Sequence, residues 1–177
     1  MLKNTENSYG TITKIFHWLM SIMIIGLIIV GFIMSSMESS PEKFQLYYAH
    51  KAAGVVILIL VILRIIWRLN NKLVQLPTEL PLFVKFCAKV THYLQYVFML
   101  LMPISGVLMS ILSGREIPVF GIFTVPALEK NTQLAGIFYQ IHVIAIWFFI
   151  ALIIFHVLAA LYHHFIRKDQ VLIRMIK

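Results

Sequence analysis

The fold is decided by the stretch from Leu134 to His164, which reads LAGIFYQIHVIAIWFFIALIIFHVLAALYHH. This run is apolar and is interrupted almost only by His142, His156, His163 and His164. Fourteen residues separate the first two histidines, which is nearly four turns of an α-helix, so both lie on one helix face. At about 1.5 Å per residue they are about 21 Å apart, within a hydrocarbon core of about 30 Å. Because ionisable residues inside a membrane are costly, the two histidines predict a functional site.

The composition is that of an integral membrane protein. The chain has 177 residues, of which 60% are hydrophobic, and its mean hydropathy is +0.89. The formal charge of +8 does not indicate a nucleic-acid partner, because most Lys and Arg residues flank the apolar runs. Cys87 is the single cysteine, which excludes an internal disulfide, a four-cysteine metal site and covalent haem attachment through Cys-x-x-Cys-His.

Four apolar runs are long enough to cross a bilayer. They cover about residues 15–34, 48–68, 91–112 and 134–162, with an interfacial helical lead-in at residues 82–90 and a loop at residues 113–133. The sequence therefore predicts an all-α membrane protein, an antiparallel bundle of four transmembrane helices that forms one domain over residues 1–177.

The loop charges predict the orientation of the bundle. Eleven Lys and Arg residues fall on the side of the termini and four on the other, and such an excess is typical of the cytoplasmic side. The eleven are Lys3, Lys14, Arg64, Arg68, Lys72, Lys85, Lys89, Arg167, Lys168, Arg174 and Lys177, and the four are Lys43, Lys51, Arg115 and Lys130. Both termini are therefore expected in the cytoplasm.

Depth in the membrane sorts the central histidines into two layers. His50 and His142 both lie early in spans that begin on the outer side, which predicts an outer pair. His17 opens the first span from the cytoplasm and His156 lies near the cytoplasmic end of the fourth, which predicts an inner pair. Two layers of two histidines are the arrangement needed for two b-type haems with bis-histidine ligation.

Three further histidines lie near the cytoplasmic boundary. His92 opens the third span at the depth of the inner pair and is the alternative ligand in place of His17 or His156. His163 lies near the same helix face as His156 but about 31 Å from the level of the outer pair, at the headgroup boundary. His164 is expected to anchor the helix at the interface.

Two arginines fall on the face of the second span that carries His50. Arg64 and Arg68 follow that histidine by fourteen and eighteen residues, so all three lie on nearly one face. A guanidinium near the cytoplasmic haem suits its propionates, because arginine pairs with carboxylates in a planar, bidentate manner. The alternative is that these side chains reach up to the lipid headgroups, and this is favoured for Arg68.

The chain resembles the bacterial cytochrome b561 family along nearly its whole length. The resemblance rests on short motifs in a fixed order: Ile-Phe-His-Trp-Leu around His17, His50 followed by Arg64 to Leu69, Thr-His-Tyr-Leu around His92, Pro-x-Ser-Gly at Pro103 to Gly106, Phe120-Gly121 with Pro126, and His156 leading to His163-His164-Phe-x-x-Lys168-Asp169 and Leu172-x-Arg174-Met175. It implies four helices and two b-type haems in the bacterial inner membrane, with His17, His50, His142 and His156 at the ligand positions.

The resemblance also implies an activity. A branch of the family oxidises superoxide on the outer side and reduces ubiquinone in the membrane, with two one-electron oxidations per quinol. Lys51 and Arg115 are the outer cations expected to attract superoxide, whereas Lys130 is equally well a solvated loop residue. The candidates for the quinone site are His92, His163, Arg64 and Arg68. Lipid, quinone and superoxide are the expected partners, with no nucleic acid and no obligate protein partner.

Three other functions stay open at this stage. The chain would serve as the haem-bearing membrane anchor of a larger respiratory oxidoreductase if it copurified with an iron–sulfur subunit. It would be a metal reductase if chelated iron were a better substrate than superoxide. It would be a structural or transport protein if the purified protein were colourless.

Overall fold

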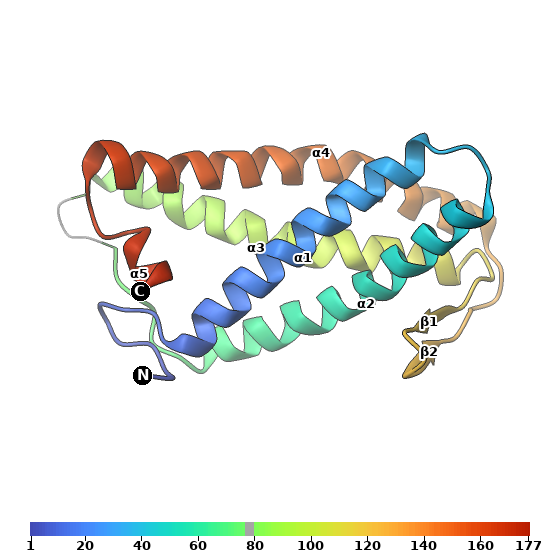
Figure 1. Ribbon diagram of the computed structural model, residues 1–177, viewed down its shortest axis with the longest axis horizontal. Helices are drawn as coiled ribbons and strands as arrows, with labels where there is room; N and C mark the ends of the chain where they lie inside the picture. The colour runs from blue at the N-terminus through green and yellow to red at the C-terminus, as the bar shows by residue number, and fades with distance from the viewer. Residues whose placement is uncertain (77–79) are drawn as a thin grey trace.

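The computed structural model describes residues 1–76 and 80–177, and four long helices make up most of the molecule. They are α1 (Thr11–Ser36), α2 (Pro41–Leu69), α3 (Leu82–Ile111) and α4 (Thr132–Tyr162). In Figure 1, α3 and α4 run side by side, while α1 and α2 form a second pair that crosses them, with both termini at one end. All four are long and apolar enough to cross a membrane. The predicted antiparallel four-helix membrane bundle is therefore confirmed.

The helices begin at recognisable capping residues. The Ser40 hydroxyl accepts a hydrogen bond from the Lys43 backbone N–H, and Pro41 occupies the first helical position of α2, where its missing N–H costs nothing. Asn131 caps α4 by accepting a hydrogen bond from the Leu134 backbone N–H.

Each helix extends beyond the apolar run that predicted it. The largest difference is in α3, which begins at Leu82, because the predicted helical lead-in at residues 82–90 is helical and continuous with the third span. Lys85 and Lys89 therefore lie in the first turns of the transmembrane helix itself. A helix satisfies its backbone hydrogen bonds internally, so it continues through the membrane interface where the hydrophobic pattern has already ended.

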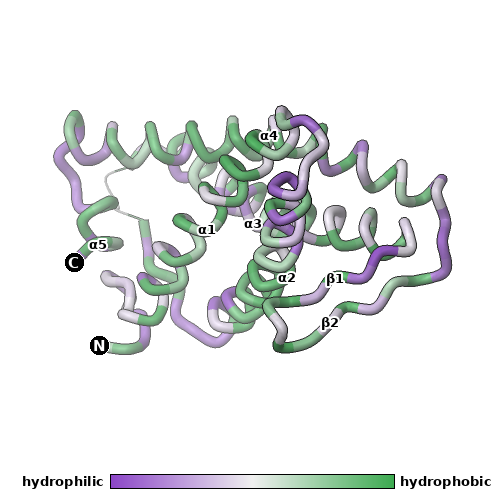
Figure 2. Tube along the Cα trace, turned by 45° about the vertical axis from the view of Figure 1, so that its right-hand side comes forward, coloured by the Kyte–Doolittle hydropathy of each residue, from purple (hydrophilic) through white to green (hydrophobic). Residues whose placement is uncertain are grey.

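The protein core lies where the four helices meet. Met20 of α1, Ile57 and Val61 of α2, Met99 of α3 and Phe149 of α4 are buried together there. Many other large apolar side chains of the helices are exposed, and hydrophobic residues make up much of the trace of α1 and α4 in Figure 2. Because lipid is as apolar as these side chains, the helices are held together by close packing rather than by exclusion of water.

A short β-hairpin interrupts the segment that was predicted to be a loop. Strand β1 (Ile117–Val119) pairs antiparallel with β2 (Phe123–Val125). Residues 120–122 form the turn, in which Phe120 and Gly121 have positive φ angles of 48° and 74°, a backbone conformation that glycine adopts without strain. Ile117 and Val119 are buried, and β1 packs against α2 at the end of the bundle away from the termini. The expectation of an irregular loop is thus wrong for these residues.

The C-terminal segment folds back over the end of the bundle that carries the termini. A π-helical turn (His163–Arg167) follows α4, and the short helix α5 (Ile173–Ile176) comes after it. The Trp18 indole Nε1 donates to the Met175 carbonyl over 3.1 Å, which ties α5 to α1. The His163 imidazole donates from Nδ1 to the Asp169 carboxylate.

The charge of Asp169 is stabilised at this turn. Burial by itself would raise the pKa of the Asp169 carboxyl, but hydrogen bonds from His163 and from the Val171 backbone N–H, with the charges of His163 and Arg167, bring it below its ordinary value. The carboxylate is therefore ionised at neutral pH and fastens the segment that follows α4.

Candidate functional site

Two histidines from different helices face each other in the half of the bundle away from the termini, which we call the outer half in line with the orientation expected from the sequence. The rings of His50 on α2 and His142 on α4 have centroids 6.4 Å apart and lie at 82° to each other. Glycines leave room for both rings: a Cβ at Gly31 would lie 3.5 Å from His50 Cε1, and a Cβ at Gly106 would lie 3.2 Å from His142 Cε1. Because Gly31 and Gly106 have no side chains, α1 can lie close to His50 and α3 close to His142.

Three histidines converge in the inner half of the bundle. The centroids of His17 on α1 and His156 on α4 are 6.1 Å apart, and those of His92 on α3 and His156 are 5.9 Å apart. The structure thus brings together both predicted pairs, and it places the alternative ligand His92 as close to His156 as His17 is. All three rings are half-buried.

Arg64 joins the inner histidines to an aromatic side chain. Its Nη2 lies 3.4 Å from Nδ1 of His17, and its Nε donates to the Tyr96 hydroxyl over 3.3 Å. The guanidinium carbons of Arg64 and Arg68 lie 5.7 Å and 5.3 Å from the centroid of the Tyr96 ring. Both predicted arginines therefore lie at the inner layer, Arg64 half-buried and Arg68 exposed.

A large cavity opens beside the inner histidines. Its volume is about 920 Å³, and His17, His92 and His156 are among its lining residues. Among the described residues that line it, none is Asp or Glu, whereas five are cationic: Arg64, Arg68, Lys72, Lys85 and Lys89. Part of its wall comes from the C-terminal segment, through Leu172, Met175 and Ile176.

Tyr9 also lines this cavity and does not neutralise its cations. Burial raises the pKa of the Tyr9 phenol above its ordinary value, although Arg68 and Arg174 oppose that shift. The phenol is therefore uncharged at neutral pH. Lys72 pairs with Glu6 over 3.5 Å, but Arg64, Arg68 and Lys89 still give the cavity positive charge, which suits an anionic group.

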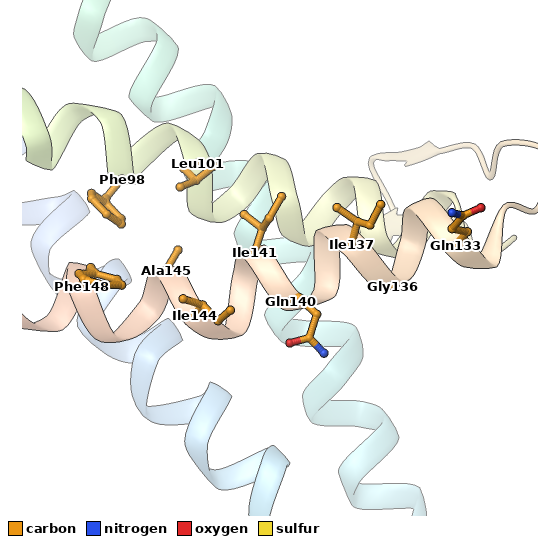
Figure 3. A pocket seen from close by; sticks show the side chains of 10 residues that line it. All are labelled: Phe98, Leu101, Gln133, Gly136, Ile137, Gln140, Ile141, Ile144, Ala145 and Phe148. Atoms are coloured by element: carbon orange, nitrogen blue, oxygen red, sulfur yellow. The ribbon is translucent and has the colours of Figure 1, made fainter.

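A second hollow lies on the outside of the bundle. It is an apolar groove of about 730 Å³ along α3 and α4, where Phe98 and Phe148 stand at one end and Gln133 at the other (Figure 3). The four histidines of the two predicted pairs are not among the residues that line it. In a membrane this groove faces lipid, so we do not place the site there.

The two outer cations singled out from the sequence lie near each other. Lys51 follows His50 on α2 and is half-buried, while Arg115 is exposed in the turn between α3 and β1. Packing of β1 against α2 brings Arg115 to this end of the bundle.

The comparison with known proteins decides the family. The model for prokaryotic cytochrome b561 matches residues 8–177. The chain belongs to the prokaryotic cytochrome b561 family. Cytochrome b561 homolog 2 of Escherichia coli (strain K12) is 31% identical over 182 residues, covering 98% of this chain and 93% of the relative. Probable superoxide oxidase CybB of Yersinia pestis is 29% identical over 165 residues, covering 90% of each. Cytochrome b561 homolog 1 of Escherichia coli (strain K12) is 26% identical over 140 residues, covering 78% of each.

Membership of the cytochrome b561 family implies electron transfer in a bacterial membrane with b-type haem. The histidine spacing fits that group. Metal–imidazole bonds of about 2.0–2.1 Å, with about 1.1 Å from each ring nitrogen to its centroid, require centroids about 6.3 Å apart. The observed separations are 6.4 Å for the outer pair and 6.1 Å and 5.9 Å for the two inner combinations.

Several residues around these histidines were not predicted from the sequence. Gly31 and Gly106 were not linked to the histidines, although each stands in an apolar helix at the depth of the outer pair. Tyr96 was missed as well, and its position one turn after His92 was the available signal. Ser105 lies within the Pro-x-Ser-Gly motif, but the motif alone assigns it no partner.

Proposed function

We propose that this cytochrome b561 family member is a di-haem oxidoreductase of the superoxide:quinone type. The observation that carries the proposal is the presence of two histidine layers, each with the ring separation expected of bis-histidine ligation. His50 and His142 would hold the outer haem, and His17 and His156 the inner one. When bound, haem with two histidine ligands supplies one-electron transfer and has no open position for oxygen.

His92 is the alternative ligand of the inner haem. Its ring lies 5.9 Å from that of His156, so distance does not separate it from His17. We favour His17 because it opens the first span at the depth of His156, and Arg64, which lies beside it, would bind the propionates of a haem held there. Arg68, on the same helix and exposed, is the second candidate for a propionate.

The proposed orientation places both termini in the cytoplasm. Figure 1 shows both termini at the same end of the bundle. The proposed orientation rests on the excess of Lys and Arg residues at that end. The outer haem then lies toward the periplasm of a bacterial inner membrane, and the cationic cavity toward the cytoplasm.

The proposed reaction oxidises two superoxide anions to oxygen and reduces one ubiquinone, with two protons, to ubiquinol. Lys51 and Arg115 support an anionic substrate on the outer side, because neighbouring cations raise the local concentration of anions. The relative named probable superoxide oxidase CybB supports the same activity.

The inner cavity is the proposed place for the quinone. Its volume of about 920 Å³ and its mixed apolar and polar lining suit a ring with a hydrocarbon tail. His92, Arg64 and Arg68 line the cavity and are candidates to bind the quinone oxygens. His163 is absent from its lining and pairs with Asp169, so it is the weakest of the four candidates.

Superoxide-dependent ubiquinone reduction by the purified, haem-loaded protein tests the activity. The double variant Lys51→Glu with Arg115→Glu reverses two charges and is expected to lower the second-order rate constant at least tenfold at low salt, with a weaker effect at high salt. Lys130→Glu is the matched control and is expected to have a smaller effect. The proposal fails if wild-type protein reduces chelated iron but not quinone, or if a stable iron–sulfur subunit is required.

A further inference from the structure

The outer histidine on α4 is held by a polar contact that the proposed function does not use. Nδ1 of His142 lies 2.9 Å from the Met102 carbonyl oxygen and 3.1 Å from the Ser105 hydroxyl oxygen. The Ser105 hydroxyl also donates to the Met102 carbonyl over 3.0 Å. Ser105 is only 1% exposed, so water does not replace these contacts. We call Ser105 and the Met102 carbonyl the His142 bracket.

The bracket determines which nitrogen of His142 carries the hydrogen. A carbonyl oxygen accepts hydrogen bonds and cannot donate, so a hydrogen must lie on Nδ1. The Ser105 hydroxyl donates its hydrogen to the same carbonyl oxygen, so its own oxygen is free to accept. The Nδ1 hydrogen can therefore form a bifurcated hydrogen bond to the Met102 and Ser105 oxygens. Nε2 therefore has a free lone pair, which is the form of imidazole that binds a metal.

The surroundings of Nδ1 are different at two of the other proposed ligands, His50 and His17. Nδ1 of His50 is buried and makes no hydrogen bond in the described part of the chain, although it faces the Leu27 carbonyl. Nδ1 of His17 faces Arg64, whose guanidinium can only donate. Among the contacts of the described residues, a serine hydroxyl beside Nδ1 is thus found at His142 and at neither His50 nor His17.

We propose that Ser105 is a positioning residue that, together with the Met102 carbonyl, orients the His142 ring for iron binding and lowers the reduction potential of the outer haem. The inference rests on the proposed bis-histidine site. A hydrogen bond from the far nitrogen to an oxygen acceptor fixes the ring orientation and makes the ligand more basic. A more basic ligand stabilises ferric over ferrous iron, and second-shell hydrogen bonds are among the means by which proteins set haem potentials.

The experiment separates the two layers before it tests the serine. His156→Ala is expected to leave only the outer haem, and His50→Ala only the inner one. Ser105→Ala is then added to each background and to the wild type, and the reduction potentials and low-spin EPR signals are measured. Ser110→Ala is the matched control, because Ser110 is a buried serine on the same helix whose hydroxyl donates to the Arg115 carbonyl.

The expected result is confined to the outer layer. In the outer-only background, Ser105→Ala shifts the ferrous-to-ferric equilibrium about tenfold toward ferrous iron, which is about 59 mV for one electron. It also broadens the EPR signal, because the His142 ring is less firmly oriented. In the inner-only background the potential stays unchanged, which also shows that the variant folds.

Two results would overturn the inference. One is an unchanged potential and EPR signal in the outer-only background. The other is an equal shift in both backgrounds or in the Ser110→Ala control. If the two histidine variants do not yield single-haem proteins at all, the proposed function fails rather than the role of Ser105.

Discussion

Replacing Gly106 by alanine is expected to weaken the outer haem site selectively. An added Cβ would lie 3.2 Å from Cε1 of His142, closer than the ordinary contact range that begins at 3.4 Å, and 3.4 Å from Nδ1, at the lower limit of that range. The ring must then move by a few tenths of an ångström. That movement strains its hydrogen bonds to Met102 and Ser105, which measure 2.9 Å and 3.1 Å.

The size of this effect follows from two opposing contributions. Overpacking a tight site costs about 1–3 kcal/mol. Replacing a helical glycine by alanine returns about 0.5–1 kcal/mol, because the unfolded chain loses freedom. The net cost therefore lies between about 0 and 2.5 kcal/mol, and a cost of about 1–2 kcal/mol within that range corresponds to roughly 5–30-fold weaker retention of the outer haem.

Haem transfer from the purified protein to excess apomyoglobin measures that retention. Gly106→Ala is expected to release one haem 5–30-fold faster than the wild type and to retain the other at the wild-type rate. The matched control is Gly136→Ala on α4, where an added Cβ meets nothing within 4 Å. Equal release rates for Gly106→Ala, Gly136→Ala and the wild type would refute the placement of a haem ligand at His142.

Two further variants test the inner end of the bundle. Arg64→Gln removes a charged donor beside His17 and is expected to weaken inner haem binding about tenfold, with partial recovery in Arg64→Lys. A haem titration measures these affinities, and equal affinity in the wild type and both variants would show that Arg64 is not part of the site. Because the pKa of Asp169 is lowered in the folded protein, its contribution to stability is present above its unfolded pKa and is lost as the pH falls through its folded pKa. Acidification, or Asp169→Asn at neutral pH, is therefore expected to free the C-terminal segment for carboxypeptidase digestion, whereas Glu129→Gln in an exposed loop leaves it protected; resistance at low pH would contradict this.

The regular rise of the α-helix explains why the levels of the site histidines were predictable from the sequence. A helix rises by a fixed distance per residue, so the numbering of His50, His142, His17 and His156 gives their levels in the membrane. The structure brings each predicted pair within ring contact. Charge at the interface likewise predicted that Arg64 lies at the inner layer.

Rotation about the helix axis was less predictable than depth. His92 has the same depth as the inner pair, and only the packing of α3 against α4 shows that it is as close to His156 as His17 is. The glycines at Gly31 and Gly106 act through a neighbouring helix, which no single-helix pattern contains.

Short elements at the ends of the bundle were missed for a different reason. The hairpin β1–β2 has three-residue strands, too short for an alternating pattern to stand out. The fold of the C-terminal segment depends on single contacts, such as the one from Trp18 to Met175, between residues far apart in the sequence.

The most direct test of the central claim is a haem count on the purified wild type and on single His→Ala variants. We predict two b-type haems in the wild type and one in each variant of His17, His50, His142 and His156, with both haems retained in His92→Ala. A single haem in the wild type, or two haems in the variants of an assigned pair, would contradict the two-layer site. Loss of a haem in His92→Ala but not in His17→Ala would contradict the inner pairing.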